Sequence, residues 1–419
     1  MILTVDAVSG NCHAHAMPDS LRVAGGRALA VLLAAGHGGM APGQGPCMVV
    51  APGLLAGQGL AMSGRCAVAC TVPGVGGVAH SSAGGAAATA LARCGVRAVL
   101  VRGVVPVEQE GRVLIIDGTK GALVPSPLHT EARDTKTSTR RMAALAAHWP
   151  EAACLVDAGH LGRLGVPIAN TAFSDARLHP SSHAGSCSGM VLGMAGIDAM
   201  AILKGGAAKG DKAVAGRAFA VAMRAHAART GAACSLRCGS QCPGGHGGHA
   251  RKWPGFAEHW SSGQAGADAA LLERYATLCD ALQLDAFALA TRLEQLVEQG
   301  QLTRNAADVL DALELLGQRP AGARLLEGLR EWMPPRRPGK GGRQGMVMDT
   351  LGLCRYAMDA LEGDAAVRVA FEELFTAVTG CSAANLDALV DAAWTVENGG
   401  PAPMPHRGRG ALGSVREEE

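Results

Sequence analysis

The spacing of the hydrophobic residues changes near residue 206, and this change limits the fold of the chain more than any other feature. Before it, short apolar runs alternate with glycine-rich turns, as at residues 48–50, 96–101 and 113–116. Such runs are typical of short strands joined by tight connections. After it, apolar residues recur three and four positions apart, as at residues 213–228 and 267–282, which is the period of an amphipathic helix. The sequence therefore predicts an α+β fold, β-rich first and mostly α-helical afterwards.

The predicted domains follow this division. A β-rich domain covers residues 1–206, an α-helical domain covers 207–398, and residues 399–419 form a flexible tail. Residues 334–343 are rich in proline, glycine and arginine, so we expect a connector there or a surface loop that touches a partner.

Individual elements are predicted in both parts. In the first, residues 107–117 suggest a hairpin with its turn at Glu110 and Gly111, and residues 199–203 form a last strand. In the second, Gly300 is expected to end a helix that starts near residue 286. The other predicted helices cover residues 267–282, 305–316, 323–333, 353–361, 365–379 and 384–396.

The charge of the chain argues against a polyanionic partner. Its 38 basic and 36 acidic side chains leave a net charge of +2, which gives no electrostatic footprint for nucleic acid or for an anionic membrane. Prolines and glycines interrupt the long uncharged stretch at residues 28–64, so we predict no transmembrane span. The first residues lack the basic and apolar segments of a signal peptide, which indicates a cytoplasmic protein.

Three of the 13 cysteines stand close together, at Cys234, Cys238 and Cys242, and Cys354 follows at a distance. Four thiolates are what a [4Fe–4S] cluster needs, and a proline follows the last clustered cysteine, as in ferredoxin loops. Two other interpretations stay open, namely a zinc site completed by nearby histidines and burial without any metal. The isolated cysteines are expected to be packing residues: Cys66, Cys70, Cys94 and Cys381.

A short acidic pattern occurs twice, once at residues 280–285 (DALQLD) and once at residues 349–354 (DTLGLC). We expect the first copy between two helices and the second just ahead of one. Such a turn presents backbone N–H groups and a carboxylate to one small volume, which suits the rim of a pterin ring. The alternative is a pair of helix caps, in which each aspartate satisfies free amides at a helix N-terminus.

Together with the cysteines, these paired motifs resemble those of the tungsten-containing aldehyde ferredoxin oxidoreductase family, in a shortened form. Gly25-Gly26-Arg27 and the residues after it are similar to the opening of that family. Ser63-Gly64-Arg65 is similar to its first cofactor-binding stretch. The similarity continues through residues 157–170, 189–204 and 346–396.

The resemblance implies an oxidoreductase that oxidises an aldehyde, or a similar small substrate, at a tungsten or molybdenum bis-pyranopterin centre. Electrons would pass through a [4Fe–4S] cluster, with Cys354 as fourth ligand, to ferredoxin or an iron–sulfur partner subunit. Arg65 would link the cluster to one pterin, and the Ser82 carbonyl would help to hold Mg²⁺ between the pterin phosphates. Gly84 and Gly85 would allow close approach to a phosphate. The residues that would line the pterins are Asp280, Leu284, Asp285, Asp349, Gly352 and Leu353.

The chain departs from the family pattern at positions that matter for chemistry. Cys234 and Cys238 are separated by one more residue than in the family. The family's arginine-rich phosphate loop is replaced by residues 183–188, HAGSCS. The long helical region that carries a catalytic histidine is missing between the two acidic motifs. Glu258 lies one place from the family's active-site glutamate, and His259 beside it is a candidate proton carrier.

Two other functions therefore stay open. One is a non-catalytic or electron-transfer paralogue whose open cofactor face is covered by another subunit, in a homo- or hetero-oligomer. The other is a zinc-stabilised structural protein without pterin.

Overall fold

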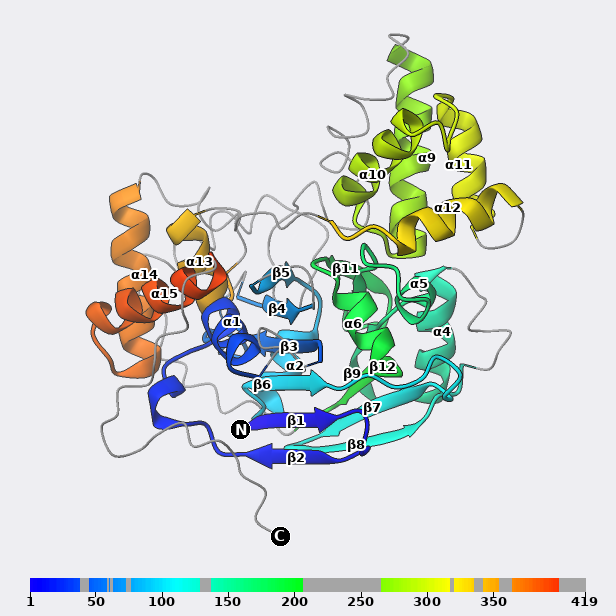
Figure 1. Cartoon of the computed structure of the whole chain (residues 1–419). Helices are drawn as coiled ribbons and strands as arrows, with labels where there is room; N and C mark the ends of the chain where they lie inside the picture. The colour runs from blue at the N-terminus through cyan, green and yellow to red at the C-terminus, as the bar shows by residue number, and fades with distance from the viewer. Residues whose placement is uncertain are drawn as a thin grey trace.

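The α+β prediction is confirmed by the structure, a computed structural model. It describes residues 1–37, 45–58, 60, 63–72, 77–128, 137–205, 265–316, 320–334, 342–353 and 364–398. Within these ranges, two six-stranded sheets are followed by helices. Figure 1 shows both sheets in the lower part of the molecule, with α13, α14 and α15 beside the first and α9 to α12 above the second.

The first sheet has the strand order β2-β1-β6-β3-β4-β5. Only β1 and β6 are parallel among its neighbouring pairs. Its strands are β1 (Ile2–Asp6), β2 (Cys12–His15), β3 (Cys47–Pro52), β4 (Cys66–Thr71), β5 (Ala79–Ala83) and β6 (Ala98–Arg102). Its helices are the short η1 (Asp19–Leu21), α1 (Gly26–His37) and α2 (Ala87–Arg93).

The second sheet has the strand order β11-β10-β9-β12-β7-β8. Here β7 and β12 are the parallel pair, and the remaining neighbours are antiparallel. Its strands are β7 (Arg112–Asp117), β8 (Lys120–Pro125), β9 (Ala152–Asp157), β10 (Thr171–Ser174), β11 (Pro180–Ala184) and β12 (Ile197–Leu203). Its helices are α4 (Ser138–His148), α5 (His160–Arg163) and α6 (Ser188–Met194).

The two sheets have the same topology, so the first half of the chain contains an internal structural duplication. In each copy a hairpin leads through a helix to three antiparallel strands, and a second helix then leads to a last strand parallel to the first. Strand register makes the copies comparable residue by residue: Val50 pairs with Val99 in the first sheet as Val156 pairs with Met200 in the second.

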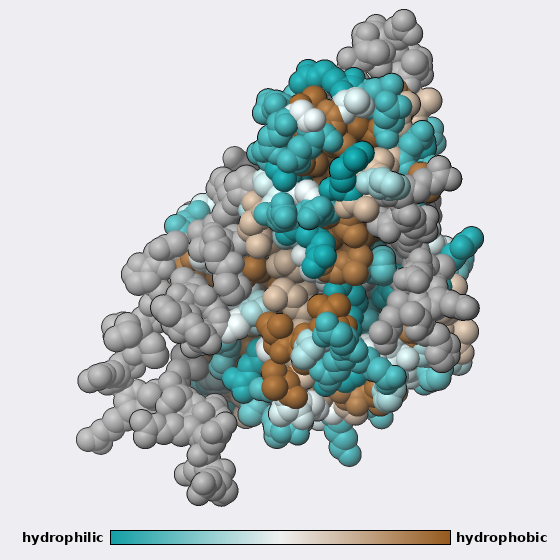
Figure 2. All heavy atoms as spheres, turned by 45° about the vertical axis from the view of Figure 1, so that its right-hand side comes forward, coloured by the Kyte–Doolittle hydropathy of each residue, from teal (hydrophilic) through white to brown (hydrophobic). Residues whose placement is uncertain are grey.

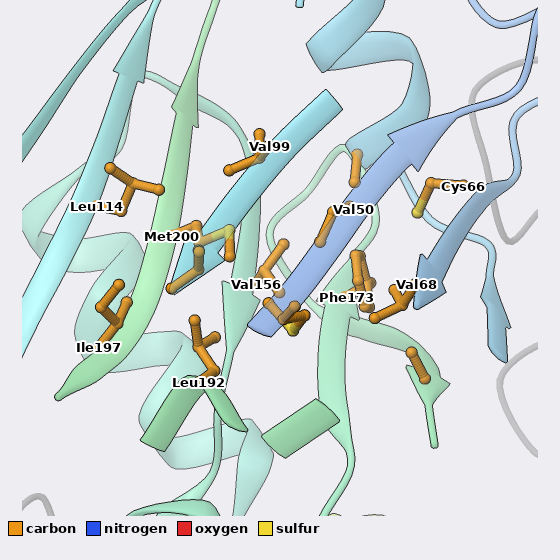
Figure 3. Close-up of a cluster of buried hydrophobic side chains, with 14 of the residues drawn as sticks. Val50, Cys66, Val68, Val99, Leu114, Val156, Phe173, Leu192, Ile197 and Met200 are labelled. Carbon is orange, nitrogen blue, oxygen red and sulfur yellow. The ribbon is translucent and has the colours of Figure 1, made fainter. Parts of the chain in front are cut away.

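The inner strands β3, β4, β6, β9 and β12 are buried on both faces and therefore read as nearly continuous apolar runs. In β3, Val49 and Ala51 face one hydrophobic cluster, and Met48 and Val50 face another, as the two-residue period of a strand requires. The second cluster joins the two sheets. Figure 3 shows Val50 and Val68 of the first sheet and Val156, Phe173 and Met200 of the second in this shared core. Helices α2 and α6 also contribute to it, so the two copies share one interior.

The later helices cover two different surfaces. Helices α9 (Ala265–Leu282), α10 (Ala286–Glu298), α11 (Ala306–Glu314) and α12 (Pro320–Arg330) share a core with residues 161–169 of the second copy. Helices α13 (Gly342–Leu351), α14 (Asp364–Thr379) and α15 (Ala383–Glu397) pack with α1 on the outer face of the first sheet. The remaining cluster packs α4 on the outer face of the second sheet.

Most predicted elements inside the described residues are confirmed, with shifted ends, and the predicted hairpin turn is wrong. The hairpin turn lies between β7 and β8, where Asp117 pairs with Lys120, and Glu110 and Gly111 lie before β7. Helix α13 starts at Gly342, inside the expected connector. Gly300 follows α10 with a φ of 69°, as expected of a residue beyond a helix C-terminus. The predicted helices at 213–228 and 353–361 lie outside the described residues, apart from Leu353 itself.

Among the residues coloured in Figure 2, hydrophilic ones surround several apolar patches on this face. In the part of the chain that the structure describes, no helix has the length and apolarity needed to cross a membrane.

Candidate functional site

Both acidic motifs form the C-terminal cap of a helix. Helix α13 ends at Leu351, and Gly352 then adopts a φ of 80°. Helix α9 ends at Leu282, and Gln283 adopts a φ of 56°. The next residue in each motif donates its N–H back into the helix, Leu353 to the Met348 carbonyl at 2.9 Å and Leu284 to the Cys279 carbonyl at 2.8 Å. This is the Schellman arrangement, which explains the spacing of the motif.

Each cap docks on one copy of the duplicated sheet through equivalent backbone bonds. The Arg65 N–H donates to the Gly352 carbonyl at 3.1 Å, and the Asn170 N–H donates to the Gln283 carbonyl at 2.7 Å. A glycine after β3 or β9 allows the close approach in each case. A Cβ on Gly53 would lie 2.1 Å from Gly352 Cα, and one on Gly159 would lie 2.7 Å from Gln283 Oε1.

The strand register shows that these docking residues are counterparts. Ala67 and Ala172 occupy equivalent places on β4 and β10, because each pairs with the equivalent residue of the preceding strand. Ala67 also pairs with Ser82, and Ala172 pairs with His183. We define half-site I as Gly53, Arg65, Ser82, Asp349 and Gly352. Half-site II is then Gly159, Asn170, His183, Asp280 and Gln283, in the same order.

Half-site I brings together residues that lie far apart in the sequence. Ser82 Oγ donates to Asp349 Oδ1 at 2.7 Å, and Arg65 Nη2 donates to the Ser82 carbonyl at 2.8 Å. Arg65 and Asp349 thus meet at the edge strand β5, between the first sheet and α13. Leu353 is buried below them in the hydrophobic cluster that the first sheet shares with α13. The structure therefore places Arg65, Ser82, Asp349, Gly352 and Leu353 in one site.

A buried ion pair between α1 and α15 lies next to half-site I. Arg27 of α1 is fully buried and donates to both carboxylate oxygens of Glu397, at the end of α15, over 2.7–2.9 Å. His80 Nδ1 lies 2.8 Å from the same carboxylate, and its Nε2 lies 3.8 Å from Asp349 Oδ2. Burial by itself raises the pKa of Glu397, but the hydrogen bonds and charges of His80 and Arg27 outweigh it and hold that pKa below its ordinary value.

Half-site II has different side chains on the same frame. His183 Nδ1 lies 3.6 Å from Asp280 Oδ1. Gln283 Nε2 donates to Asp157 Oδ2 at 2.6 Å, and Arg141 binds the same carboxylate through Nε and Nη2.

The last residues of the first motif have structural contacts. Asp285 is the N-cap of α10, since its Oδ1 accepts the N–H groups of Phe287 and Ala288 at 3.0 Å each. Leu284 is buried and forms an isolated bridge with Ala169. The first motif therefore ends one helix and begins the next, as its predicted position between two helices requires.

The edge strands β5 and β11 meet between the half-sites through reciprocal bonds. The Gly84 N–H donates to Ser182 Oγ at 2.9 Å, and the N–H of its counterpart Gly185 donates to Ser81 Oγ at 3.0 Å. Such exchange is what a twofold relation between the copies requires. Gly85 has a φ of 85°, and a Cβ there would lie 2.6 Å from the Ser174 carbonyl oxygen, so this turn accepts only glycine without a shift.

The predicted cluster ligands lie outside the described residues: Cys234, Cys238, Cys242 and Cys354. Glu258 and His259 also lie outside them. Among the residues that the structure does describe, no group of three or more His, Cys, Asp or Glu side chains is arranged to hold a metal ion. Cys66, Cys70 and Cys94 are buried packing residues, as predicted. Burial raises the pKa of the Cys66 thiol to about 12, which keeps it protonated and inert.

The duplicated first half of the chain matches a known protein family. Residues 2–209 match the family described as "Aldehyde ferredoxin oxidoreductase, N-terminal domain". The first half of this chain belongs to that domain family. The expected resemblance is therefore confirmed over both sheets. The aldehyde ferredoxin oxidoreductase N-terminal domain contributes every strand of the two half-sites, while the acidic motifs that dock on them lie beyond the matched residues.

One solved structure extends the similarity of fold beyond this domain. It is the active-site complex BamBC of benzoyl coenzyme A reductase in complex with 1,5-dienoyl-CoA. The similarity has a TM-score of 0.52 at 15% identity and covers 87% of this chain but 64% of that chain. At this identity the likeness concerns the fold alone. No protein of curated function matches the chain in sequence.

Several residues of the site were not predicted from the sequence. Glu397 and His80 are separated from Asp349 by long stretches of chain, and nothing local to them indicates that they meet. The signal for Arg27 is an arginine in an otherwise apolar helix, where burial of the charge requires a partner. The equivalence of Asn170 with Arg65 depends on the duplication, whose two copies share few identical residues, among them Gly84 with Gly185 and Leu91 with Leu192.

Proposed function

We propose that this chain is a redox protein that binds a tungsten or molybdenum pterin in half-site I, beside a [4Fe–4S] cluster. Membership of the aldehyde ferredoxin oxidoreductase N-terminal domain family supports an oxidoreductase. The observation that carries the proposal is the meeting of Arg65, Ser82 and Asp349 at one edge of the first sheet.

The chemistry of half-site I suits a pterin. Arg65 is partly buried and carries a planar fork of N–H donors, which matches ring acceptors and phosphate oxygens. Asp349, with a side chain 19% exposed, supplies carboxylate acceptors for ring N–H groups. Gly352 carries no side chain, and Gly53 below it lets the cap sit directly on the sheet. These residues would hold the pterin, while Arg27 and Glu397 keep β5 and α13 in place.

The cluster is assigned to Cys234, Cys238, Cys242 and Cys354. Cys354 directly follows Leu353, the buried residue of the second cap. This position in the sequence supports a cluster next to half-site I, because Leu353 belongs to the cap that docks on the first sheet. When bound, the pterin metal centre would exchange two electrons with a substrate, and the cluster would carry these electrons one at a time.

The chain's own residues have defined roles in this proposal. Ser82 orients Asp349 by donating to Oδ1, which leaves Oδ2 for other donors. Arg65 Nη2 donates to the Ser82 carbonyl, and that bond helps to orient its guanidinium. A magnesium ion bound to the Ser82 carbonyl oxygen would share that oxygen with Arg65. An aldehyde is the proposed substrate, with Glu258 and His259 as proton carriers and ferredoxin as electron acceptor.

Metal analysis of protein purified without oxygen tests the proposal. We expect about four irons per chain, tungsten or molybdenum, and a broad thiolate-to-iron absorption that dithionite bleaches. Cys354→Ser should remove the iron while the far-UV circular dichroism of the folded chain persists. Stoichiometric zinc without iron would refute the proposal and favour a zinc-stabilised structural protein.

A second function is favoured by the missing helical region between the two acidic motifs. The chain also spans 64% of a chain from the BamBC active-site complex. A shortened electron-transfer or non-catalytic subunit that needs a partner would fit this coverage. Viologen-linked aldehyde oxidation by the isolated chain distinguishes the two: turnover supports the enzyme, and a full cluster and metal without turnover supports the partner-dependent subunit.

A further inference from the structure

Half-site II keeps the backbone frame of half-site I but differs from it in the side chains that would meet a cofactor. We propose that the centre holds one pterin, in half-site I, and that half-site II has become a structural support that fastens α9 and α10 to the second sheet. This inference rests on the proposed function, because it concerns how many pterins accompany the metal.

The first difference is the loss of a cation. Arg65 in half-site I is replaced by Asn170 in half-site II, although both donate the same backbone bond to a helix cap. Asn170 is 8% exposed, and its Oδ1 has no hydrogen-bond partner in the structure. An anionic ligand with phosphate oxygens therefore finds a bidentate, charged donor at one position and an uncharged amide at its counterpart.

The second difference is that acceptor oxygens fill the space next to Gly185. A Cβ on Gly185 would lie 3.0 Å from Asp285 Oδ2 and 3.4 Å from Asn170 Oδ1. Gly185 is the counterpart of Gly84, the glycine expected to approach a phosphate. Both groups turn acceptor oxygens towards this space, whereas a phosphate needs hydrogen-bond donors there.

The third difference is the side chain at the cap itself. Gly352 has no side chain, and a Cβ there would lie 2.7 Å from Gly53 Cα in the docked turn. Gln283 instead directs its side chain onto Asp157. Asp157 is also held by Arg141, and all three side chains belong to residues at most 1% exposed. Gln283 adopts a positive φ in spite of its Cβ, so the fold keeps the cap without the residue that suits it best.

These contacts explain why the first acidic motif persists without a pterin. Leu284 closes the cap of α9, Asp285 begins α10, and Gln283 anchors the turn to the sheet. Asp280 lies beside His183 and receives a bond on its carbonyl from Ser138. Backbone bonds from the Asp285 N–H to the Ile168 carbonyl and from the Asn170 N–H to the Gln283 carbonyl then hold this turn to the second copy.

The number of pterins per metal atom tests the inference directly. Wild-type protein matured in a pterin-competent host is denatured, its pterin is oxidised to the fluorescent derivative, and this is counted against tungsten or molybdenum and against iron. We expect one pterin per metal atom. Two per metal atom would overturn the inference and leave the proposed function standing. A chain with a full cluster but neither pterin nor metal would overturn the proposed function.

Matched substitutions then locate the pterin, because the duplication supplies a control for each residue. Arg65→Gln should lower the pterin content at least tenfold relative to iron, whereas Asn170→Ala should leave it within twofold. Asp349→Asn and Asp280→Asn form a second pair with the same expected contrast, in case a variant of the first pair does not fold. Equal losses from both members of a pair would show that half-site II also binds a pterin.

Discussion

The ion pair between Arg27 and Glu397 gives the sharpest prediction about stability. Replacing Glu397 by glutamine keeps the shape of the side chain but removes its charge. Arg27 is then left fully buried, with its Nη1 3.6 Å from Asp349 Oδ2. Breaking a buried pair by removing one partner costs about 3–5 kcal/mol, since the remaining charge keeps its desolvation penalty. That cost lowers the equilibrium for docking α15 on α1 by roughly two to four powers of ten.

Hydrogen exchange is the suitable assay, because it reports the opening of single helices in a chain of this size. The amides of α1 and α15 should lose protection by at least a hundredfold in Glu397→Gln, while those of β9 and β12 keep theirs. Trp394 provides a second probe, since its ring lies 5.9 Å from Arg27 Cζ. Its fluorescence should shift towards that of an exposed indole at lower urea concentrations than in the wild type.

Arg343 of α13 provides the matched control, because its ion pairs hold the same helix, α15. It joins α13 to α15 through Asp387 and Asp391, but its side chain is 46% exposed. Surface pairs of this kind contribute about 0–1 kcal/mol, so Arg343→Ala should change the protection of α15 by less than about tenfold. If Glu397→Gln and Arg343→Ala had equal effects, the buried pair would not be what holds α15 in place.

Three further outcomes are expected. The pKa of Glu397 is lowered on folding, so its contribution to stability is present above the unfolded pKa near 4.5 and is lost as the pH falls through the folded pKa. The hydrogen-exchange protection of α15 should therefore decrease only in that acid range. A loss already near pH 6 would contradict the role of Glu397 in holding α15. Gly53→Ala should lower the free energy of unfolding in urea by about 1–3 kcal/mol, since its Cβ meets the Gly352 backbone. Gly36→Ala, with open space around it, should instead stabilise α1 by up to about 1 kcal/mol. The opposite order would refute the close docking of the cap. The double change Arg27→Met with Glu397→Leu should be near neutral in urea unfolding, as is typical when both charges of a buried pair are replaced, and a loss as large as that of Glu397→Gln alone would indicate that packing rather than charge dominates.

The parts of the fold that the sequence predicts are those fixed by local chemistry. Gly300 ends α10 because a residue beyond a helix readily adopts a positive φ when it is glycine. The run at residues 199–203 is buried on both faces, and its apolar side chains indicate a central strand. The change from strands to helices is confirmed for the same reason, since the spacing of apolar residues depends only on which face is buried.

The parts that the sequence does not predict depend on contacts between distant residues. The hairpin of β7 and β8 turns at Gly118 and Thr119, but Glu110-Gly111 offers an equally good local turn, and only pairing with β12 decides between them. Helix α13 begins in a glycine-rich stretch because its later residues, such as Met346 and Leu351, are buried against α1. Packing there outweighs the low intrinsic helix propensity of glycine. The acidic motifs are predicted as turns. Their role as C-terminal caps becomes evident only once the helices that they end, α9 and α13, are known.

The parallel pairing of the first and last strands in each copy has a consequence for how the chain is made. During synthesis, β1 leaves the ribosome long before β6, its neighbour in the sheet, and β7 likewise precedes β12. Each sheet therefore cannot close until its last strand has been translated, since an N-terminal region folds as the chain emerges. The inner face of the first sheet, with Met48, Val50 and Val68, then stays uncovered until the second copy arrives. A nascent chain paused between the copies would expose this apolar face and become a substrate for chaperones that bind hydrophobic segments.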